Sequence, residues 1–370
     1  MRRVAYLFPQ GDLGGAEIAT ARIVEAHDRQ RYVPVALLLT DGPLAERLRR
    51  ADIDVRVAPL RPHLTDTRQR RQVREWIAVQ LRSDGTPLLH SVMAWAHALA
   101  APGAAAAGAR AVWFQHNRPS LASLIDWWAA LNDASLIITN SQFTARLQRR
   151  LNVARRRIEV VYPPVVPPQR VCDVAEIRDA LGFTGSDLIA LLPARLQRWK
   201  GQDIAIRSLA TAAQQAPRLH LLLAGDALFG LEHDYRNELE QLANQLGVSQ
   251  RLRFAGHRED IGALYQASDM VLHTSREPEP YGLSVAEART HGCAIVASDA
   301  GAIPEQIAHD RNGLLFKPGD PEALALAMVR LANQPELRRR LGAAAASDTA
   351  VTPTAAARQL EGLYDQVLEQ

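Results

Sequence analysis

The chain has 370 residues, 47% of them apolar, which is enough for two domains that each bury a core. No apolar run is long enough to span a bilayer, and the first residues lead directly into a strand pattern rather than a signal peptide. The sequence therefore predicts a soluble cytoplasmic protein.

The formal net charge of +3 is small for this length, and arginine supplies nearly all of the cations. Basic residues cluster at Arg68–Arg71 with Arg74 and again at Arg146–Arg157, without the interleaved aromatics of single-strand nucleic-acid binders. We interpret both clusters as solvated helix faces and expect no nucleic-acid partner; peripheral contact with the inner membrane face is the alternative. Cys172 and Cys293 lack metal-ligand spacing and are predicted to be free thiols.

The first part of the chain alternates short apolar runs with helical patterns. The runs are Val4–Phe8, Val33–Leu39, Val55–Val57, Leu88–His90, Ala111–Gln115 and Leu136–Thr139. Such alternation predicts a parallel sheet covered on both faces, with ligands at the carboxyl ends of the strands. The glycine-rich turn Gly11–Gly15 opens a helix from Ala16 to about Arg29, which is a general arrangement for phosphate binding. His116 and Asn117 fall just past another strand end.

Other features of this part are interpreted as structural. Asp52 and Asp54 have the spacing with which sugar-nucleotide enzymes of another fold hold a divalent metal, but they lie beside a strand, away from the glycine turn. Trp127 and Trp128 are expected to pack in a core or a domain interface, with stacking against an acceptor substrate as the alternative. The proline-dense run Val161–Pro168 is predicted to be a stiff linker.

The second part of the chain repeats the alternation. Its apolar runs are Leu188–Leu192, Leu219–Leu223, Leu252–Ala255, Met270–His273 and Ala294–Ala297. Arg195 and Lys200 follow the first of these strands, where two fixed cations could neutralise a diphosphate, although in isolation such residues are commonly surface charges. A last helix is predicted from about Thr354 to Leu368.

The most informative stretch is Ser275–Gly292, which lies between two of these strands. Tyr281–Gly282 would mark the start of a helix, whose free N–H groups suit a phosphate. Glu279 in the loop and Glu287 in the helix, with seven residues between them, frame that start. We interpret the two carboxylates as hydroxyl acceptors beside a phosphate site, a combination that suggests a sugar nucleotide; solvated glutamates are the simpler alternative.

This stretch resembles the donor-site signature of the retaining, glycogen-synthase-like glycosyltransferases of family four, or glycosyl transferases group 1. Their pattern is Glu-x-Phe-Gly-Leu-x-x-x-Glu-Ala, and this chain has Glu279-Pro-Tyr-Gly-Leu-Ser-Val-Ala-Glu-Ala288. The similarity extends to Gly14-Gly-Ala-Glu17, to His116 and to Arg195-Leu-Gln-Arg-Trp-Lys-Gly201, where Ala194 replaces the usual glycine. It is concentrated in residues 193–315, and the first part of the chain matches only at Gly14–Glu17 and around His116.

The resemblance implies an α/β protein with two Rossmann-like domains that face each other across a cleft, the GT-B architecture, and a C-terminal helix that returns to the first domain. Residues 1–165 with 354–370 would form the acceptor-side domain, residues 166–173 the linker and residues 174–353 the nucleotide-sugar domain.

The resemblance also assigns site residues. The catalytic candidates are His116, Arg195, Lys200 and Glu279. The donor-binding candidates are Gly14, Gly15, Arg195, Lys200, His257, Arg258, Glu279, Tyr281, Gly282, Leu283, Ser284 and Glu287, and the acceptor-side candidates are Glu17 and Asn117. In the family the two cations hold the diphosphate, the histidine and the first glutamate contact the donor sugar, and the second glutamate binds the ribose.

The implied reaction moves a sugar from a nucleoside-diphosphate sugar to an acceptor hydroxyl, with retention at the anomeric carbon and without a metal or another cofactor. One alternative is a sugar-nucleotide epimerase on the same architecture. A second is a non-catalytic sugar-nucleotide-binding subunit. The sequence does not specify the nucleobase, the donor sugar, the acceptor or the oligomeric state.

Overall fold

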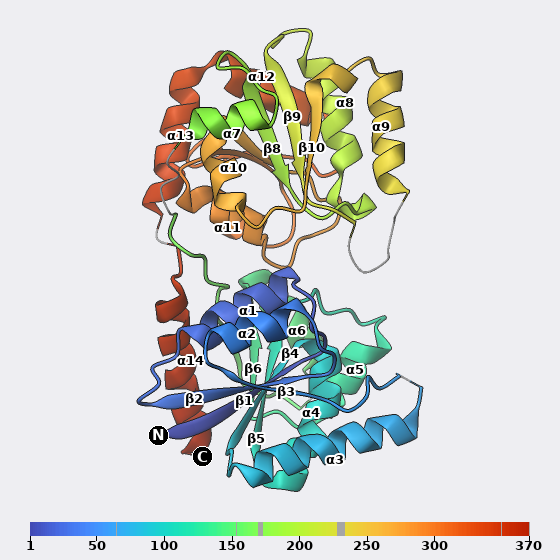
Figure 1. The fold of residues 1–370 in the computed structure, drawn as a ribbon, viewed down its shortest axis with the longest axis vertical. Coiled ribbons are helices and arrows are strands. Elements are labelled where there is room, and N and C mark those ends of the chain that lie inside the picture. The colour runs from blue at the N-terminus through green and yellow to red at the C-terminus, as the bar shows by residue number, and fades with distance from the viewer. Residues whose placement is uncertain (64, 153, 169–172, 228–233, 349, 370) are drawn as a thin grey trace. The chain divides into compact units, whose positions relative to one another are not determined.

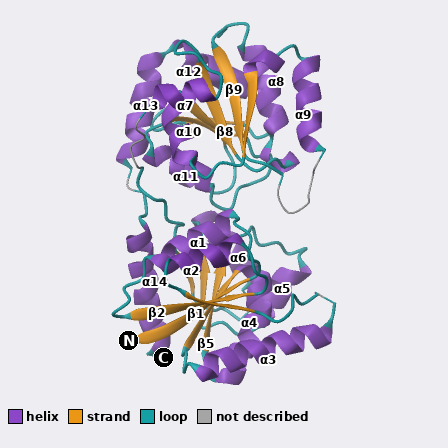
Figure 2. Cartoon of the chain, viewed as in Figure 1, coloured by secondary structure: helices purple, strands orange, loops and turns teal. Residues whose placement is uncertain are grey.

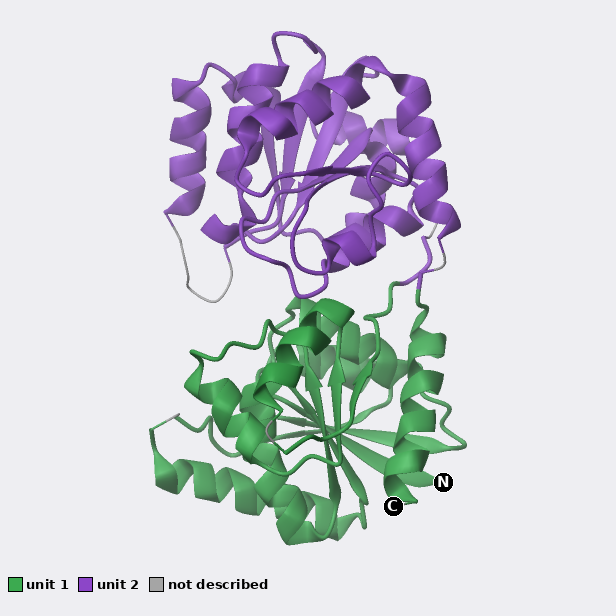
Figure 3. Cartoon of the chain, turned by 180° about the vertical axis from the view of Figure 1, so that it is seen from behind, with its two compact units in different colours: residues 1–165, 351–370 green, residues 166–350 purple. Residues whose placement is uncertain are grey.

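The computed structural model describes residues 1–63, 65–152, 154–168, 173–227, 234–348 and 350–369. The chain divides into two compact units, residues 1–165 with 351–370 and residues 166–350 (Figure 3). Residues 351–353, which the sequence analysis places in the second domain, lie in the first unit, where the Val165 N–H donates to the Val351 carbonyl at 2.9 Å. Residues 169–172 of the predicted linker, with Cys172, lie outside the described residues, and Cys293 is a buried free thiol.

The first unit is a parallel sheet between layers of helices (Figures 1 and 2). Its elements are β1 (Arg2–Phe8), α1 (Gly15–Glu25), β2 (Tyr32–Leu38), α2 (Pro43–Arg50), β3 (Asp54–Val57), α3 (Thr67–Ser83), β4 (Leu88–Val92), α4 (Met93–Ala107), β5 (Arg110–Gln115), α5 (Leu124–Leu131), β6 (Leu136–Thr139), α6 (Gln142–Leu151), β7 (Ile158–Val160) and α14 (Pro353–Leu368). Within the described residues the strand order is β3-β2-β1-β4-β5-β6-β7. The order reverses between β1 and β4, which makes the carboxyl ends of these two strands the expected ligand edge.

Strands of this sheet are apolar throughout because both of their faces are covered. Side chains of β1, β2 and β4 alternate between a core with α1, α2 and α14 and a second core with α3 and α4. Asp52 and Asp54 lie at the start of the β3 edge strand, where Asp54 pairs with Arg56, in agreement with a structural role.

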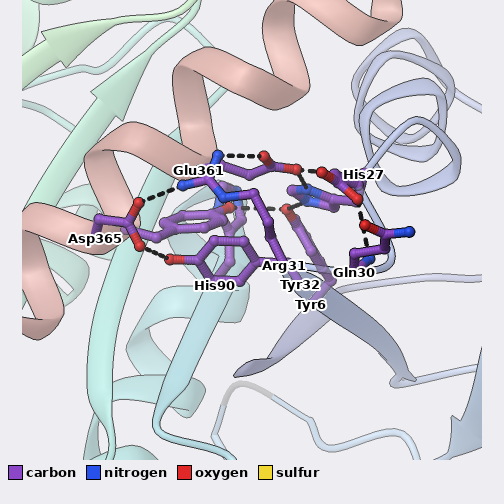
Figure 4. A network of polar contacts seen from close by, with 10 residues as sticks. Tyr6, His27, Gln30, Arg31, Tyr32, His90, Glu361 and Asp365 are labelled. Atoms are coloured by element: carbon purple, nitrogen blue, oxygen red, sulfur yellow. Dashed lines mark hydrogen bonds and ion pairs between the residues drawn. The ribbon is translucent and has the colours of Figure 1, made fainter. Parts of the chain in front are cut away.

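The last helix, α14, packs in the first unit, as predicted, through a buried polar network (Figure 4). The Tyr6 hydroxyl lies 2.8 Å from the Tyr364 hydroxyl and 2.6 Å from His27 Nε2. The Tyr364 hydroxyl also lies 2.6 Å from His90 Nδ1, and Glu361 meets His27 Nδ1 at 2.9 Å. Buried polar groups are costly without partners, so this network favours one position of α14 on β1, β4 and α1.

The second unit repeats the architecture. Its elements are α7 (Val174–Ala180), β8 (Leu188–Pro193), α8 (Gln202–Ala212), β9 (Leu219–Ala224), α9 (Tyr235–Gln245), β10 (Leu252–Gly256), α10 (Ile261–Ala267), β11 (Met270–His273), α11 (Leu283–Thr290), β12 (Ala294–Ser298), β13 (Leu314–Phe316), α12 (Pro321–Asn333) and α13 (Pro335–Ser347), with short 3-10 helices at Arg198–Lys200, Ser249–Arg251 and Ile303–Glu305. Among the described residues the parallel sheet has the order β10-β9-β8-β11-β12-β13, which reverses between β8 and β11.

Both units therefore show the parallel, helix-covered sheets that the alternating pattern predicts. The two strands that the sequence analysis missed, β7 and β13, are edge strands of three residues each, too short for a periodic signal. No helix in the described ranges combines the length and apolar character needed to cross a bilayer.

Candidate active site

A largely buried cluster of polar residues lies at the switch point of the second sheet. β8 and β11 are neighbours, with Met270 opposite Ala190 and Val271 opposite Leu191. The loops that leave these two strands carry Lys200 and Glu279, which are far apart in the sequence. Ligands of doubly wound sheets bind at such a position because the two loops diverge there and leave room between them.

Lys200 and Glu279 form a largely buried ion pair. The Lys200 ammonium donates to both carboxylate oxygens of Glu279, at 3.0 and 2.9 Å, and the side chains are 16% and 12% exposed. The same ammonium lies 3.9 Å from the centre of the Trp199 ring, within cation–π range. The two residues that the sequence analysis assigned separately to diphosphate and sugar are thus in direct contact.

Two further side chains hold the Glu279 carboxylate. The Ser275 hydroxyl donates to Oε2 at 2.9 Å, and His273 Nε2 lies 3.4 Å from the same oxygen. The other ring nitrogen of His273 lies 3.1 Å from the Ser298 hydroxyl. Burial by itself raises the pKa of Glu279, but the Lys200 ammonium and His273 outweigh burial and hold this pKa well below its usual range. Glu279 is therefore an anion throughout the physiological pH range.

Two glycines permit the close approach of the loops. Gly201 has φ +72°, and a Cβ there would lie 2.2 Å from the Thr274 carbonyl oxygen. Gly301 has φ +69°, and a Cβ there would lie 2.2 Å from the Glu279 carbonyl oxygen. The backbone of Glu279 is further fixed by the Ala302 N–H, which donates to its carbonyl at 2.9 Å. The backbone that carries the carboxylate is consequently in close contact with a neighbouring loop.

The helix α11 begins at Leu283, four residues after Glu279. Gly282 is its N-cap, with φ +88°, and the Gln306 amide donates to the Tyr281 carbonyl at 2.5 Å, which fixes the turn. The first N–H groups of a helix have no partner within it, so those of Leu283 and Ser284 are available to an anion. Glu287 lies in the next turn, where the Tyr265 hydroxyl donates to its Oε2 at 3.3 Å.

The remaining donor-binding candidates are more dispersed. Arg195 is half-buried in the loop after β8, and its carbonyl accepts from the Gln202 amide at 2.7 Å. His257 is exposed after β10, the outer strand of the sheet, while Arg258 forms two hydrogen bonds with Asp260, at 2.7 and 2.6 Å. The hydrogen bonds and ion pairs that the structure gives for His257 and Arg258 do not join them to the Lys200–Glu279 pair.

The first-unit candidates follow β1 and β5, the two strands on either side of β4 in the first sheet. His116, after β5, is 5% exposed, stacks on Phe114 with ring centres 4.0 Å apart, and lies 3.1 Å from the Thr20 hydroxyl of α1. Burial lowers the pKa of His116 to about 3, so the imidazole is neutral at physiological pH. Thr20 thereby links His116 to the helix that the glycine turn opens.

The other first-unit candidates flank this link. Gly14 is the N-cap of α1 and Gly15 its first residue, with open space where a Gly15 Cβ would lie. Glu17, in the first turn, is 2% exposed and accepts a hydrogen bond from the Gln10 amide at 3.2 Å. Asn117 is exposed, with its amide 3.4 Å from the Met93 sulfur. Gly14, Gly15 and Glu17 share one helix start with the Thr20–His116 contact one turn away, while Asn117 lies outside it.

Sequence reasoning missed His273, Ser275 and Trp199. His273 ends the buried strand β11, and the rule that selected His116, a histidine at the carboxyl end of a strand, also applies to it. Trp199 has no comparable signal, because its contact with the Lys200 ammonium depends on side-chain direction. Among the described residues, no group of three or more His, Cys, Asp or Glu could hold a metal ion.

Two family models together match most of the chain. The model of Glycosyltransferase Family 4 matches residues 13–167, and that of Glycosyl transferases group 1 matches residues 173–348. The chain is 30% identical over 222 residues to mannosylfructose-phosphate synthase of Agrobacterium fabrum, across 57% of this chain and 48% of that protein. It is 29% identical over 232 residues to D-inositol 3-phosphate glycosyltransferase of Corynebacterium urealyticum, across 60% and 54%. The chain spans about half the length of the curated relatives it matches.

Solved structures match over the whole chain. The Anabaena protein HepE, whose crystal structures contain UDP, UDP-glucose, or UDP with glucose, is 27% identical with a TM-score of 0.87, across 99% of this chain and 100% of HepE. The two parallel-sheet domains and this match define the GT-B fold class of glycosyltransferases. The chain belongs to family four of these enzymes, so the predicted family and fold are confirmed.

Proposed function

We propose that the protein transfers a sugar, with retention at the anomeric carbon, from a nucleoside-diphosphate sugar to an acceptor hydroxyl in the biosynthesis of a glycan, a lipid-linked sugar or a small glycoside. The observation that carries the proposal is the Lys200–Glu279 pair beside the N-terminus of α11, at the switch point of the second sheet. HepE, the similar protein solved with UDP and UDP-glucose, supports a uridine nucleotide as the first donor to test.

The second unit supplies groups that suit the leaving diphosphate. The Lys200 ammonium has three N–H donors, so it can retain Glu279 and still donate to a phosphate oxygen. Arg195 lies in the same loop, and the N–H groups of Leu283 and Ser284 add neutral donors. Together they would stabilise the charge that develops on the diphosphate as the glycosidic bond breaks. Fixed cations in this position motivate the proposal that no metal and no other cofactor is needed.

We assign the carboxylates to hydroxyl recognition. Glu279, held as an anion by Lys200 and His273, would accept hydrogen bonds from the donor sugar, and Glu287 from the ribose. In the proposed retaining mechanism the acceptor attacks on the face that the diphosphate leaves, and a diphosphate oxygen takes the acceptor proton. No general base is nominated. His116 is neutral, so it would contribute a hydrogen bond to the donor sugar rather than a charge.

The experiment has a binding arm and a turnover arm. In thermal-shift assays, UDP and other nucleoside diphosphates should raise the melting temperature of the wild type. Arg195→Ala and Lys200→Ala should each lower kcat/KM with the identified donor on the order of 10²-fold. The matched control is Lys317→Ala, because Lys317 is the other lysine of the chain and is exposed. This variant should keep wild-type activity. Activity should also survive exhaustive chelation.

The same assays separate the alternatives. A sugar-nucleotide epimerase would convert the sugar nucleotide incubated alone, without an acceptor. A non-catalytic binding subunit would show the thermal shift but no turnover with any acceptor. Wild-type rates in both the Arg195 and Lys200 variants would refute the assignment of the site.

A further inference from the structure

The outer face of α5 exposes leucines to an unusual degree. Leu124 is 83% exposed and Leu131 is 73% exposed, while Leu121, just before the helix, is 54% exposed. Large apolar side chains in the described part of the chain are mostly buried, and three of the few exceptions fall within residues 121–131. Scattered exposed leucines need no explanation, but a local group of them marks an interaction site.

These leucines form a stripe with a tryptophan. Leu124, Trp128 and Leu131 are spaced at i, i+4 and i+7, so they share one face of α5. The opposite face, with Ala129 and Ala130, is buried against the sheet. Trp128 is half-buried and also packs against the cores of the first unit, so the exposed apolar surface of this face comes from the leucines beside it.

Arginines of α3 border the stripe. The guanidinium of Arg70 lies 4.8 Å from the centre of a Trp128 ring and that of Arg74 lies 5.6 Å from it. Arg68 and Arg71 are exposed on the same helix, and only Glu75 offsets the charge of these four cations within α3. We call Arg68, Arg70, Arg71 and Arg74 with Leu121, Leu124, Trp128 and Leu131 the α3–α5 surface.

We propose that the α3–α5 surface docks the protein on an anionic phospholipid bilayer. Leucine side chains would enter the boundary of the acyl chains, the tryptophan would lie at the level of the headgroups, and the arginines would meet lipid phosphates. Charge complementarity selects this occupant: an apolar stripe alone would suit a second copy of the chain, but the adjoining cations would then face the same cations of the copy.

The position of the surface gives it a consequence for the proposed reaction. α5 follows β5, and residues 117–123 lead from His116 to the exposed Leu124. A bilayer on the α3–α5 surface would therefore hold the first unit, which carries the acceptor-side candidates, at the lipid surface. The docking itself depends only on exposure and charge, so it can be tested apart from the reaction.

The test is co-sedimentation of the full chain with vesicles of phosphatidylcholine alone or mixed with phosphatidylglycerol. We expect binding to the anionic vesicles only. Leu124→Gln with Leu131→Gln should lower the partition coefficient at least tenfold, and Arg70→Gln with Arg71→Gln about fivefold for each charge removed. Leu326→Gln, a leucine 67% exposed on α12 of the second unit, is the matched control and should bind as the wild type does.

A second readout follows insertion directly. Brominated lipids should quench the tryptophan fluorescence of the wild type and of the Leu326 variant, but not of the double leucine variant. Absence of binding to anionic vesicles, or an equal loss in the Leu326 variant, would overturn the proposal. So would a dimer that the double leucine variant dissolves without any change in lipid binding, because a second copy would then be the occupant. Unchanged circular dichroism and melting temperature would show that the variants are folded.

Discussion

Replacing Lys200 with methionine should destabilise the second unit through Glu279. The two side chains are 16% and 12% exposed, so the substitution leaves a poorly solvated carboxylate without its cation. Removing one partner of a buried ion pair commonly costs about 3–5 kcal/mol. Ser275 still donates to the carboxylate at 2.9 Å, and methionine keeps an unbranched apolar side chain of similar length at position 200. We therefore expect the lower end of that range, about 3 kcal/mol.

A double-mutant cycle isolates the ion pair from the other contacts of each residue. Glu279→Gln keeps an acceptor for Ser275 but leaves the ammonium unpaired, with an expected loss of about 2 kcal/mol. The double variant carries neither charge and should lose no more than Lys200→Met alone, a coupling of about 2 kcal/mol. Hydrogen–deuterium exchange of peptides from β8 and β11 reports the opening free energy of this unit. Lys317→Met is the matched control.

The pH dependence gives a second check, because stability should fall with falling pH in the wild type and rise with falling pH in the variant. In the wild type the pKa of Glu279 is depressed, because Lys200 and His273 outweigh burial. The stability that ionised Glu279 contributes is therefore complete above the unfolded-state pKa of about 4.3 and is lost only as the pH falls through the lower folded-state pKa. Without Lys200, burial should raise this pKa, and Lys200→Met should regain stability as the pH falls from about 7 to 5. Additive single effects, or the same destabilisation at both pH values, would refute the reasoning.

Three other positions or pairs test the fold and the site. Gly301→Ala would place a Cβ 2.2 Å from the Glu279 carbonyl oxygen at φ +69°. The substitution should lower the opening free energy of the second unit by about 2 kcal/mol or more in the hydrogen–deuterium exchange assay, and wild-type protection would contradict the close approach. His97, which is buried in α4, and His116 both have a pKa that burial lowers to about 3, so the unfolded chain takes up protons first as the pH falls. The first unit should therefore lose about 1.4 kcal/mol of unfolding free energy per histidine for each pH unit between about 6.5 and 3. An unfolding free energy from denaturant titration that is constant from pH 6.5 to 5 would contradict this reasoning. Glu361→Gln removes the 1%-exposed charge that anchors α14 and should lower the first unit's unfolding free energy by about 2 kcal/mol, whereas an unchanged melting temperature would show that the network is dispensable.

The local pattern of the sequence was sufficient to predict most elements and the fold class. The predicted strand Met270–His273 has the same bounds as β11, and the helix predicted at Gly282 begins at Leu283. Alternation of apolar strands and amphipathic helices depends on periods of two and 3.6 residues, which neighbouring residues alone specify. The family motif added the residues at which ligand loops leave these strands.

Tertiary structure decided which of these loops meet. β8 and β11 lie side by side although β9 and β10 separate them in the chain, and this order brings Lys200 to Glu279. The same order places His273 and Ser275 on that carboxylate, and α14 on the first sheet more than 180 residues after β7. Strand order is set by which apolar faces are buried together, a property of the whole domain that no local spacing records. For that reason the sequence alone identified the charges of the site, while their pairing, their burial and the depressed pKa of Glu279 followed only from the fold.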